Sequence, residues 1–489
     1  MRRFCILIFI LGLSSSLSSQ DYYHWVAFGD QAMEVGDPVG AVRYYEYAFE
    51  LDSSRQELTY ALASAYREVG NYPQALRLYL KVYSKGRGRF FPEGPREIAQ
   101  LKMYLGEYES AIEFWKRALR RTDDLEQKAW VEGQLQSCSY ALSNPIPEED
   151  VELIRLDERI NTTESESGAT MHPKGDLVFS SLRGAYDENG GLDEPSTYFA
   201  RLYHSEVDTY GASEAQQMNL QTGFDQVHFL NPRFSPAGDR LFFTLFEENS
   251  SQLGMINWED STKVIKVLTM DGLPDYPFIG HPFVFTQDEQ SFILFSAKRE
   301  TENSTYDLYW GRLSGNHVHD IKALPSSINS VGNEVTPNYQ LSDSLLYFSS
   351  DGHPGYGGYD LFQVKWHPAE AGETSLPQNL GLPLNSSLND HSLEITVEGG
   401  LVTSDRGTED VEASFCCSDI FRFSQKVEQL DTLFTDDRVP EEIEDISELN
   451  RILPIRLYFH NDIPDPGSQS RRTELSYNET VSDYLALEG

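Results

Sequence analysis

The sequence has few cysteines, few basic residues and, after its first residues, no long apolar run. Four cysteines in 489 residues are too few for a disulfide-based scaffold. Its 39 Lys and Arg stand against 77 Asp and Glu, which gives a formal net charge of -38. Such an acidic surface repels phosphate backbones, so we expect no nucleic-acid partner. No run beyond the first residues reaches the roughly 20 apolar residues that a membrane-spanning helix needs.

Catalytic and metal-binding motifs are also missing. No Gly-x-Ser-x-Gly pentapeptide marks a hydrolase nucleophile, and no His-Glu-x-x-His sequence marks a zinc site. His172, His281 and His391 recur at similar places in a repeated pattern, where we expect them to cap turns. The sequence therefore predicts a protein that is not an enzyme and that uses no metal or cofactor. An enzyme that processes glycans or peptides in a central pocket stays an alternative, because distant acidic side chains can converge in a fold.

The first 20 residues have the order of a secretory signal peptide. Arg2 and Arg3 precede the apolar run Cys5–Leu13, and serines follow. The run is about half the length that a membrane helix needs. We therefore expect a cleaved signal at residues 1–20, export, and a location in the periplasm, with peripheral association at the outer membrane as an option.

Three cysteines remain after this signal. Cys416 and Cys417 are adjacent, and adjacent cysteines rarely bridge each other because the geometry is strained. A bridge from Cys138 to this pair would join two predicted domains, and nothing in the sequence supports it. The pairing of these cysteines stays open.

Residues 21–143 show a repeated helical pattern. Its anchor positions are 34 and 36 residues apart, from 41 to 75 and from 75 to 111. Each anchor is a small residue followed by an aromatic residue and then an apolar one: Ala41, Tyr45 and Ala48; Ala75, Tyr79 and Val82; Ala111, Trp115 and Ala118. The period predicts an α-solenoid of three tetratricopeptide repeats and a closing helix. The groove of such an array commonly binds a partner protein, and the alternative is a spacer packed on the next domain.

A linker and then a strand pattern follow. Residues 144–150 contain two prolines and an acidic cluster, which break helices. Short strands with Gly/Asp turns continue to residue 430, and their anchors recur after 59, 50, 55 and 55 residues at Pro173, Pro232, Pro282, Pro337 and Ser392. This period predicts a β-propeller over residues 151–430 with five blades, or six if one is weakly patterned. We expect Val151–Arg159 to pair with the last blade and remove free sheet edges.

The best-formed unit of this pattern is Val335–Val364. An apolar run, Leu345–Phe348, predicts a buried strand, and a Gly-rich loop, Ser350–Gly358, leads to the next strand. Most of these features serve the fold in every unit. The residues left over, which we take as candidates for a contact surface, are His353, Tyr356 and Tyr359.

Two stretches resemble a known repeat. Asn231–Phe243 looks like the TolB-type propeller repeat, and Ser349–Phe362 is similar to its version in exported proteins of the Bacteroidetes. Those proteins join tetratricopeptide repeats, this propeller, a small β-domain and a C-terminal OmpA-like domain that binds peptidoglycan. They include the PorE-like components of the type IX secretion system. The resemblance covers residues 21–430 and implies protein partners for both domains.

The end of the sequence departs from that family. Residues 431–489 read as an acidic linker followed by Leu453–Leu485, which is similar to the lead-in of the OmpA-like domain. The sequence stops at Gly489, before a domain of roughly 100 residues would fit. We therefore expect no peptidoglycan binding, and a truncated remnant of an OmpA-family protein is an alternative.

Taken together, the patterns predict an α+β multidomain chain in which the α-solenoid precedes the propeller. The expected function is a non-enzymatic periplasmic scaffold, associated with the outer membrane, in envelope organisation or type IX secretion. Its protein partners would bind in the tetratricopeptide groove and on the propeller face.

Overall fold

The computed structural model describes residues 21–86, 89, 91–145, 151–184, 199–208, 211–221, 223, 226–247, 249–273, 276–301, 304–368, 375–396, 399–407 and 417–425. The predicted signal peptide, most of the predicted linker and the tail after residue 425 lie outside these residues. Met1–Lys426 belongs to one compact unit, in which helices come first and strands follow. The fold class is α+β, as predicted.

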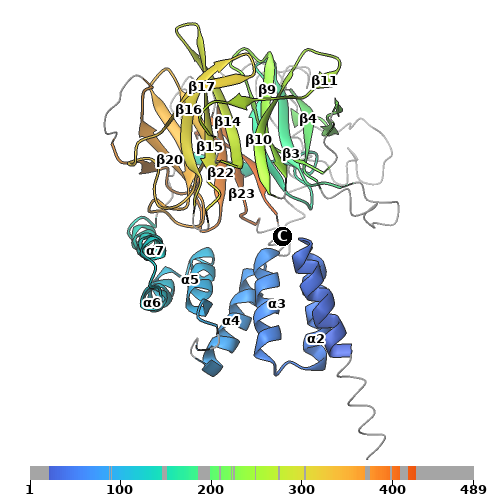
Figure 1. Ribbon diagram of the computed structural model, residues 1–489, viewed down its shortest axis with the longest axis vertical. Coiled ribbons are helices and arrows are strands. Elements are labelled where there is room, and N and C mark those ends of the chain that lie inside the picture. The colour runs from blue at the N-terminus through green and yellow to red at the C-terminus, as the bar shows by residue number, and fades with distance from the viewer. Residues whose placement is uncertain are drawn as a thin grey trace, which may run out of the picture. The chain divides into compact units, whose positions relative to one another are not determined.

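The N-terminal part of the described chain is built only of helices (Figure 1). A helix over residues 21–34 precedes α2 (Pro38–Leu51), α3 (Gln56–Glu68), α4 (Tyr72–Gly86), α5 (Gly94–Tyr104), α6 (Tyr108–Leu119) and α7 (Leu125–Ser143). The small anchors Ala41, Ala75 and Ala111 are all 0% exposed, and the three aromatic anchors are buried as well. The anchors of the predicted repeat are therefore buried in all three helical pairs.

The turns within successive helical pairs share one geometry. Gly36, Gly70 and Gly106 have φ of +77°, +71° and +72°, which a residue with a side chain rarely adopts. After each glycine, the next amide donates to a carbonyl five residues earlier, at 2.8, 2.8 and 2.7 Å. This hydrogen bond is the mark of a Schellman helix end. The three helical pairs therefore turn in the same way.

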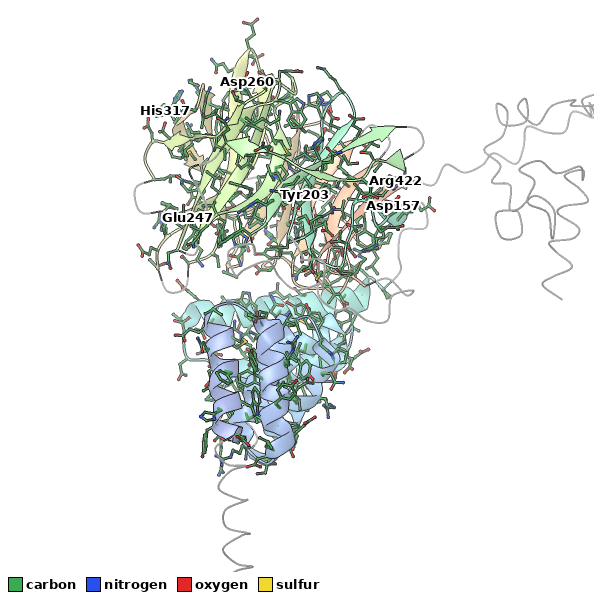
Figure 2. The ribbon with its side chains drawn as sticks, turned by 90° about the vertical axis from the view of Figure 1, so that its right-hand side faces the viewer. Asp157, Tyr203, Glu247, Asp260, His317 and Arg422 are labelled. Carbon is green, nitrogen blue, oxygen red and sulfur yellow. The ribbon has the colours of Figure 1, made fainter. Side chains whose placement is uncertain are left out.

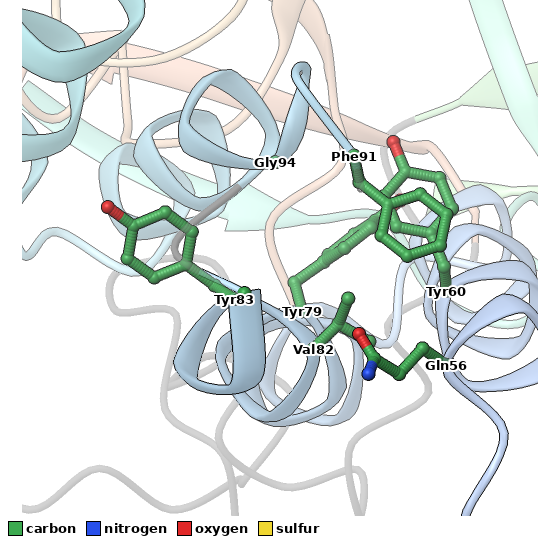
Figure 3. A pocket seen from close by; sticks show the side chains of 8 residues that line it. Gln56, Tyr60, Tyr79, Val82, Tyr83, Phe91 and Gly94 are labelled. Atoms are coloured by element: carbon green, nitrogen blue, oxygen red, sulfur yellow. The ribbon is translucent and has the colours of Figure 1, made fainter. Parts of the chain in front are cut away.

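One aromatic side chain fills the notch between α3, α4 and α5 (Figure 3). Phe91 stacks on Tyr60 with ring centroids 4.3 Å apart and an interplanar angle of 8°. Tyr79 meets Tyr60 edge-on at 5.1 Å. The cavity that remains is only about 10 Å³, so this notch has no room for a partner's side chain.

The strands fall into five groups. The first holds β2 (Glu166–Met171), β3 (Asp176–Ser181), β4 (Arg201–Asp208), β5 (Gly211–Ala212) and β6 (Gln216–Gln217); the second holds β8 (His228–Phe234), β9 (Arg240–Glu247), β10 (Ser250–Asn257) and β12 (Lys266–Val267). The third holds β13 (Thr269–Met270), β14 (Phe278–Gln287), β15 (Gln290–Lys298), β16 (Asp307–Ser314) and β17 (His317–Ala323). The fourth holds β18 (Glu334–Gln340), β19 (Leu345–Ser350), β20 (Asp360–Lys365) and β21 (Gln378–Asn379); the fifth holds β22 (Asp390–Thr396), β23 (Gly399–Ser404), β24 (Asp419–Gln425) and β1 (Val151–Arg155). Two short strands, β7 (Leu220–Gln221) and β11 (Lys263–Val264), pair with each other.

The first strands of the five groups contact one another in cyclic order: β2, β8, β14, β18, β22 and again β2. A parallel bridge between Ser251 and Phe278 also joins the second and third groups into one nine-stranded sheet. Strand β1 pairs with β24 from Val151 opposite Gln425 to Arg155 opposite Phe421. The predicted pairing of the two ends of the strand region is therefore confirmed over Val151–Arg155.

Apolar side chains hold neighbouring groups together. Five clusters each combine residues of two neighbouring groups, and the fifth cluster joins the last group to the first. Representative pairs from these clusters are Val178 with Phe243, Phe242 with Phe295, Phe285 with Phe348, Leu361 with Phe421, and Ile420 with Phe179. Burial of these side chains supplies the main stabilisation between groups and leaves the middle of the first strands for polar residues.

Candidate functional site

A cavity of about 390 Å³ lies where the first strands of the five groups meet. Every group contributes to its lining. The first strands and their starts provide Ser167, Leu230, Asn231, Gly280, His281, Val335, Thr336, Asn389 and His391, and the neighbouring segments provide Thr244, Phe246, Ser251, Tyr306, Tyr359, Asp405 and Ser418. Hydroxyl, amide and imidazole groups therefore alternate with a few aromatic rings around this central cavity.

A repeated backbone irregularity shapes the cavity. Each first strand has a β-bulge, and one bulge residue has a positive φ. These residues are Gly168 (66°), Asn231 (53°), His281 (56°), Thr336 (48°) and Ser392 (56°). A bulge re-aims the side chain that it carries, and positive φ is uncommon for residues other than glycine. Three of these residues, Asn231, His281 and Thr336, line the cavity.

The bulges correct the predicted register of the strand repeat. Pro232, Pro282 and Pro337 directly follow the positive-φ residue of their strands, so these three anchors are equivalent. Pro173 was predicted as the anchor of the first unit, but it lies beyond the end of β2, in the turn to β3. The equivalent residue in the first group is Ala169, because the β2 bulge lies between Ser167 and Thr170.

The three recurring histidines lie in two different kinds of place. His172 lies in the β2–β3 turn, where its ring contacts Phe234 at 4.8 Å and Trp258 at 5.6 Å. Its Nδ1 accepts a hydrogen bond from the Lys174 amide at 3.0 Å, so His172 caps a turn as predicted. His281 and His391 instead line the central cavity, where sequence analysis expected turn caps.

A buried ion pair crosses the middle of the strands beside the cavity. Arg233 is 5% exposed, and its Nη1 donates to Glu394 Oε2 and to Ala169 O, both at 2.8 Å. Its Nη2 donates to Leu393 O at 3.0 Å. The bridge joins β8 to β22, which are not neighbouring first strands. Arg233 and Glu394 therefore tie together two first strands that are not neighbours.

Both cavity histidines favour the neutral form. His281 Nδ1 shares a hydrogen bond with Ser296 Oγ, and its backbone amide donates to Thr244 Oγ1 at 2.9 Å. Burial lowers the pKa of His281 to about 3, and His391 and Arg233 add to that effect. Burial also lowers the pKa of His391, although Asp405 and Asp390 oppose the shift. At neutral pH both imidazoles can therefore donate or accept a hydrogen bond without bringing charge.

The cavity lining contains one carboxylate, and that carboxylate is already bonded. Asp405 accepts hydrogen bonds from Asn389 Nδ2 and from Ser418 Oγ, each at 2.6 Å. Asn389 in turn receives the Tyr359 amide at 3.0 Å. Glycoside hydrolysis ordinarily uses two carboxylates that flank the scissile bond. The described lining offers no such pair.

The three predicted contact residues occupy different environments. His353 packs against Phe348 and Phe362, and its Nε2 bonds to Ile328 O at 2.7 Å, so it supports the loop internally. Tyr359 lines the central cavity, and burial raises its pKa well above the usual value. Tyr356 is 3% exposed and faces a helix of the same chain. The structure does not bring the three together as one surface.

Tyr356 belongs to the junction between α7 and the loop after β19. Its ring meets Tyr140 edge-on at 5.4 Å, and its hydroxyl donates to Asn144 O at 2.8 Å. Gln134 Nε2 donates to Asp351 O at 3.1 Å, and the Gly355 amide donates to Ser137 Oγ at 3.3 Å. The helical array therefore packs on the strand groups, as the spacer interpretation predicts for this end of the array.

The first helical pair carries a cluster of exposed aromatic rings. Trp25 lies 5.9 Å from Phe28, 6.0 Å from Tyr44 and 5.0 Å from Tyr47. Phe28 is 48% exposed and Tyr47 is 44% exposed. We call Trp25, Phe28, Tyr44 and Tyr47 the aromatic surface. Trp25 and Tyr44 are partly buried against the helical core, so Phe28 and Tyr47 form the exposed part of this surface.

The described residues hold no group of three or more His, Cys, Asp or Glu that could bind a metal ion. None of their helices is long and apolar enough to cross a membrane. Cys138 is buried in α7 as a free thiol, so the bridge considered between Cys138 and the Cys416–Cys417 pair is not formed. Cys417 is disulfide-bonded, and its partner is outside the described residues.

A repeated polar motif that was not predicted marks the start of three first strands. In three strand groups an asparagine is followed by Ser or Thr, and a buried acidic residue comes five positions after the asparagine. The pairs are Asn161 and Glu166, Asn329 and Glu334, and Asn385 and Asp390. In each, the amide and hydroxyl of the Ser or Thr donate to the carboxylate. The spacing was visible in the sequence, and an alignment on these asparagines would have found the first strands.

No known protein family and no curated protein matches the sequence. Among solved structures, one similar chain is the TPR2B domain of yeast Sti1 in complex with an Hsp70 peptide (16% identity, TM-score 0.22). The match covers 24% of this chain and 97% of the Sti1 domain. The match to a putative TolB from Agrobacterium tumefaciens (14% identity, TM-score 0.32) covers 54% of this chain and 79% of the TolB chain. The match to an endo-arabinase from Bacteroides thetaiotaomicron (12% identity, TM-score 0.37) covers 56% of this chain and 96% of the endo-arabinase. All these TM-scores are below 0.5, so function is argued from this chain's own residues.

Proposed function

We propose that the chain is a non-enzymatic scaffold that binds a protein partner through the aromatic surface of its first helical pair. In this proposal the helices are tetratricopeptide repeats and the five strand groups are the blades of a TolB-like propeller. The observation that carries the proposal is the exposure of Phe28 and Tyr47 beside Trp25 and Tyr44. Large exposed rings in contact with one another are enriched at protein interfaces.

The position of the aromatic surface in the array supports this function. A terminal repeat of a solenoid ordinarily turns a polar face to water, because no further repeat covers it. Here the first pair exposes Phe28 and Tyr47, and its Val35 and Val39 are 73% and 54% exposed as well. Apolar area left in water costs about 25 cal/mol per Å², so a partner that covers these rings would bind with a hydrophobic gain.

The charge around the aromatic surface defines the partner further. Arg43 is the one Arg or Lys of the same helical pair. The pair exposes six acidic residues: Asp21, Asp30, Glu34, Asp37, Glu46 and Glu50. Opposite charges across an interface raise the association rate and select between partners. We therefore propose a protein segment with apolar side chains flanked by Lys or Arg.

The cellular role is proposed from the sequence. The signal-like residues 1–20 support export, and the resemblance of Asn231–Phe243 and Ser349–Phe362 supports a place among periplasmic proteins of envelope organisation or type IX secretion. Fractionation of cells that produce the full chain tests this part. Recovery in the cytoplasmic fraction with residues 1–20 still attached would contradict it.

The binding proposal is tested with a library of random peptides selected on the immobilised chain. We expect enriched peptides to combine aromatic or aliphatic residues with Lys or Arg, and to bind more weakly as salt rises. The double variant Phe28→Ser with Tyr47→Ser should lose at least tenfold in affinity. The matched control is Leu376→Ser, which removes an isolated residue that is 77% exposed. Enrichment of acidic peptides, or equal binding by both variants, would refute the proposal.

A further inference from the structure

The central cavity is a second site, independent of the aromatic surface, and its chemistry selects a ligand class. Its volume of about 390 Å³ lies within the range of roughly 300–1,000 Å³ that is typical of small-molecule sites. The Arg233–Glu394 bridge joins β8 to β22 beside it. A cavity of this volume holds a compact molecule or the end of a chain.

The charges around the cavity exclude ionic ligands. Among the described residues that line it there is no Lys or Arg, so these residues give a phosphate or carboxylate no counter-charge. Asp405 is the one acidic residue of that described lining, and its two oxygens are bonded to Asn389 and Ser418. The described residues include no metal-binding cluster. A neutral ligand is the class that remains.

Several polar groups around the cavity await a partner. Within the described residues, no hydrogen bond involves the side-chain amide of Asn231 or the hydroxyl of Tyr359, and His281 and His391 are each bonded only through Nδ1. These groups present donors and acceptors of both kinds without charge. An apolar ligand would leave them unpaired at a cost, whereas a ligand with several hydroxyls can pair with them.

Flat rings complete the recognition surface. Tyr306 and Phe246 line the same cavity as Tyr359, and Tyr306 meets the His281 ring edge-on at 5.8 Å. Rings pack against the C–H faces of a cyclic ligand, while the amide and imidazole groups address its edges. We propose that the central cavity binds a neutral mono- or disaccharide. The single, occupied carboxylate makes this a binding site rather than a hydrolytic one.

Two variants remove ligand contacts while respecting the backbone. Asn231→Gly deletes the amide at a position with φ of 53°, which glycine adopts freely and which Gly168 occupies in the first group. Tyr359→Phe deletes only the hydroxyl. The matched control is His317→Ala, because His317 lies on β17 (Figure 2) and is not among the residues that line the cavity.

The experiment is saturation-transfer NMR followed by titration calorimetry on the full chain. The probes are glucose, galactose, mannose, arabinose, N-acetylglucosamine, maltose and cellobiose, and the comparators are glucuronic acid, glucose 6-phosphate and N-acetylalanine amide. We expect at least one neutral sugar to bind at least tenfold more tightly than every comparator. Each cavity variant should weaken that sugar at least tenfold with an unchanged melting temperature, and His317→Ala should not.

Three outcomes would overturn the proposal. They are no binding of any neutral sugar to the folded chain, binding of a comparator as tight as that of the best sugar, and sugar binding that both cavity variants leave intact. Release of reducing sugar from maltose or cellobiose would overturn the claim that the site does not hydrolyse. None of these outcomes bears on peptide binding by Phe28 and Tyr47, so the two proposals fail separately.

Discussion

The helical array and the strand groups bury different chemistry. Among the described residues, the helices bury only three polar residues: Thr59, Gln134 and Ser137. Thr59 bonds to the preceding turn of its own helix, and the other two bond to the loop after β19. The strand groups bury carboxylates in every unit where the asparagine motif recurs. Both regions have apolar cores, but the strand groups also bury charged side chains, such as the Arg233–Glu394 pair, whose members are far apart in sequence.

The largest effect is expected from breaking the polar bridge of the strand region. Glu394→Ala leaves Arg233 buried without its counter-charge, which typically costs about 3–5 kcal/mol. Urea unfolding followed by circular dichroism and tryptophan fluorescence measures the loss. The matched control is Glu259→Ala, which removes an exposed pair with Lys174 whose side chains are 72% and 73% exposed. The control should leave the unfolding midpoint unchanged.

A double variant separates charge from packing at the same place. Arg233→Met with Glu394→Leu replaces both partners with apolar side chains, and such replacements are often neutral or stabilising. We expect it to regain most of the stability that Glu394→Ala loses. If Glu394→Ala alone costs under about 1 kcal/mol, the buried pair is not what holds the first strands together.

The second effect is a pH dependence confined to the strand region. Burial raises the pKa of Asp360 to about 8 and that of Glu334 to about 8. Between pH 4 and pH 8 the folded state therefore binds more protons than the unfolded state, whose carboxyls have already ionised. Stability is then highest near pH 4 and falls as pH rises toward 8.

Asp360→Asn tests this sign. An amide keeps an oxygen to accept the Tyr356 and Gly357 amides, which bond Asp360 at 2.9 and 3.1 Å, and it carries no charge. We expect the fall in unfolding midpoint between pH 4.5 and pH 7.5 to become shallower in Asp360→Asn, and shallower again with Glu334→Gln. A midpoint that rises over this interval, or a slope equal to that of the wild type, would show that these carboxyls ionise in the folded chain.

A smaller effect is expected at the junction of the two regions. Tyr356→Phe removes the hydrogen bond to Asn144 O and keeps the ring on Tyr140, which typically costs about 1 kcal/mol. The matched control is Tyr44→Phe, because no hydrogen bond within the described residues involves the Tyr44 hydroxyl. Unfolding is followed with one signal for the helices and another for the strand groups. The midpoints of these two transitions should lie further apart in Tyr356→Phe than in the control. Unchanged coincidence would mean that the junction does not couple the two regions.

The contrast between the helical array and the strand groups also explains how much of the fold could be predicted from the sequence. The anchors Ala41, Tyr45 and Ala75 repeat because each helical pair makes the same local contacts, so their spacing predicted the helices and their turns. The strand period and the pairing of Val151–Arg155 with the last strand were predicted for a similar reason, since turns and apolar runs recur in every group.

The central cavity could not be predicted from the sequence, because residues at equivalent positions of the five strand groups are of different types. The positive-φ position is Gly168 in one group, Asn231 in the next and Thr336 in another, so no residue type repeats there. The recurring proline gave a wrong anchor in the first unit, where Pro173 lies in a turn. Arg233 and Glu394 are far apart in sequence, and only the cyclic order of the strands brings them together.

The smallest predicted effect tests whether helical turns contribute only locally. Gly106→Ala places a side chain at φ of +72° with no atom within 4 Å, so the cost is backbone strain alone, about 1 kcal/mol. Gly94→Ala is the matched control, because it lies in α5, also has nothing within 4 Å, and should gain about 0.5 kcal/mol. Thermal unfolding at 222 nm measures both. If Gly106→Ala also lowers the strand transition as much as Tyr356→Phe does, the helical array stabilises the strand groups through its whole length, and the two regions do not differ in the way their cores suggest.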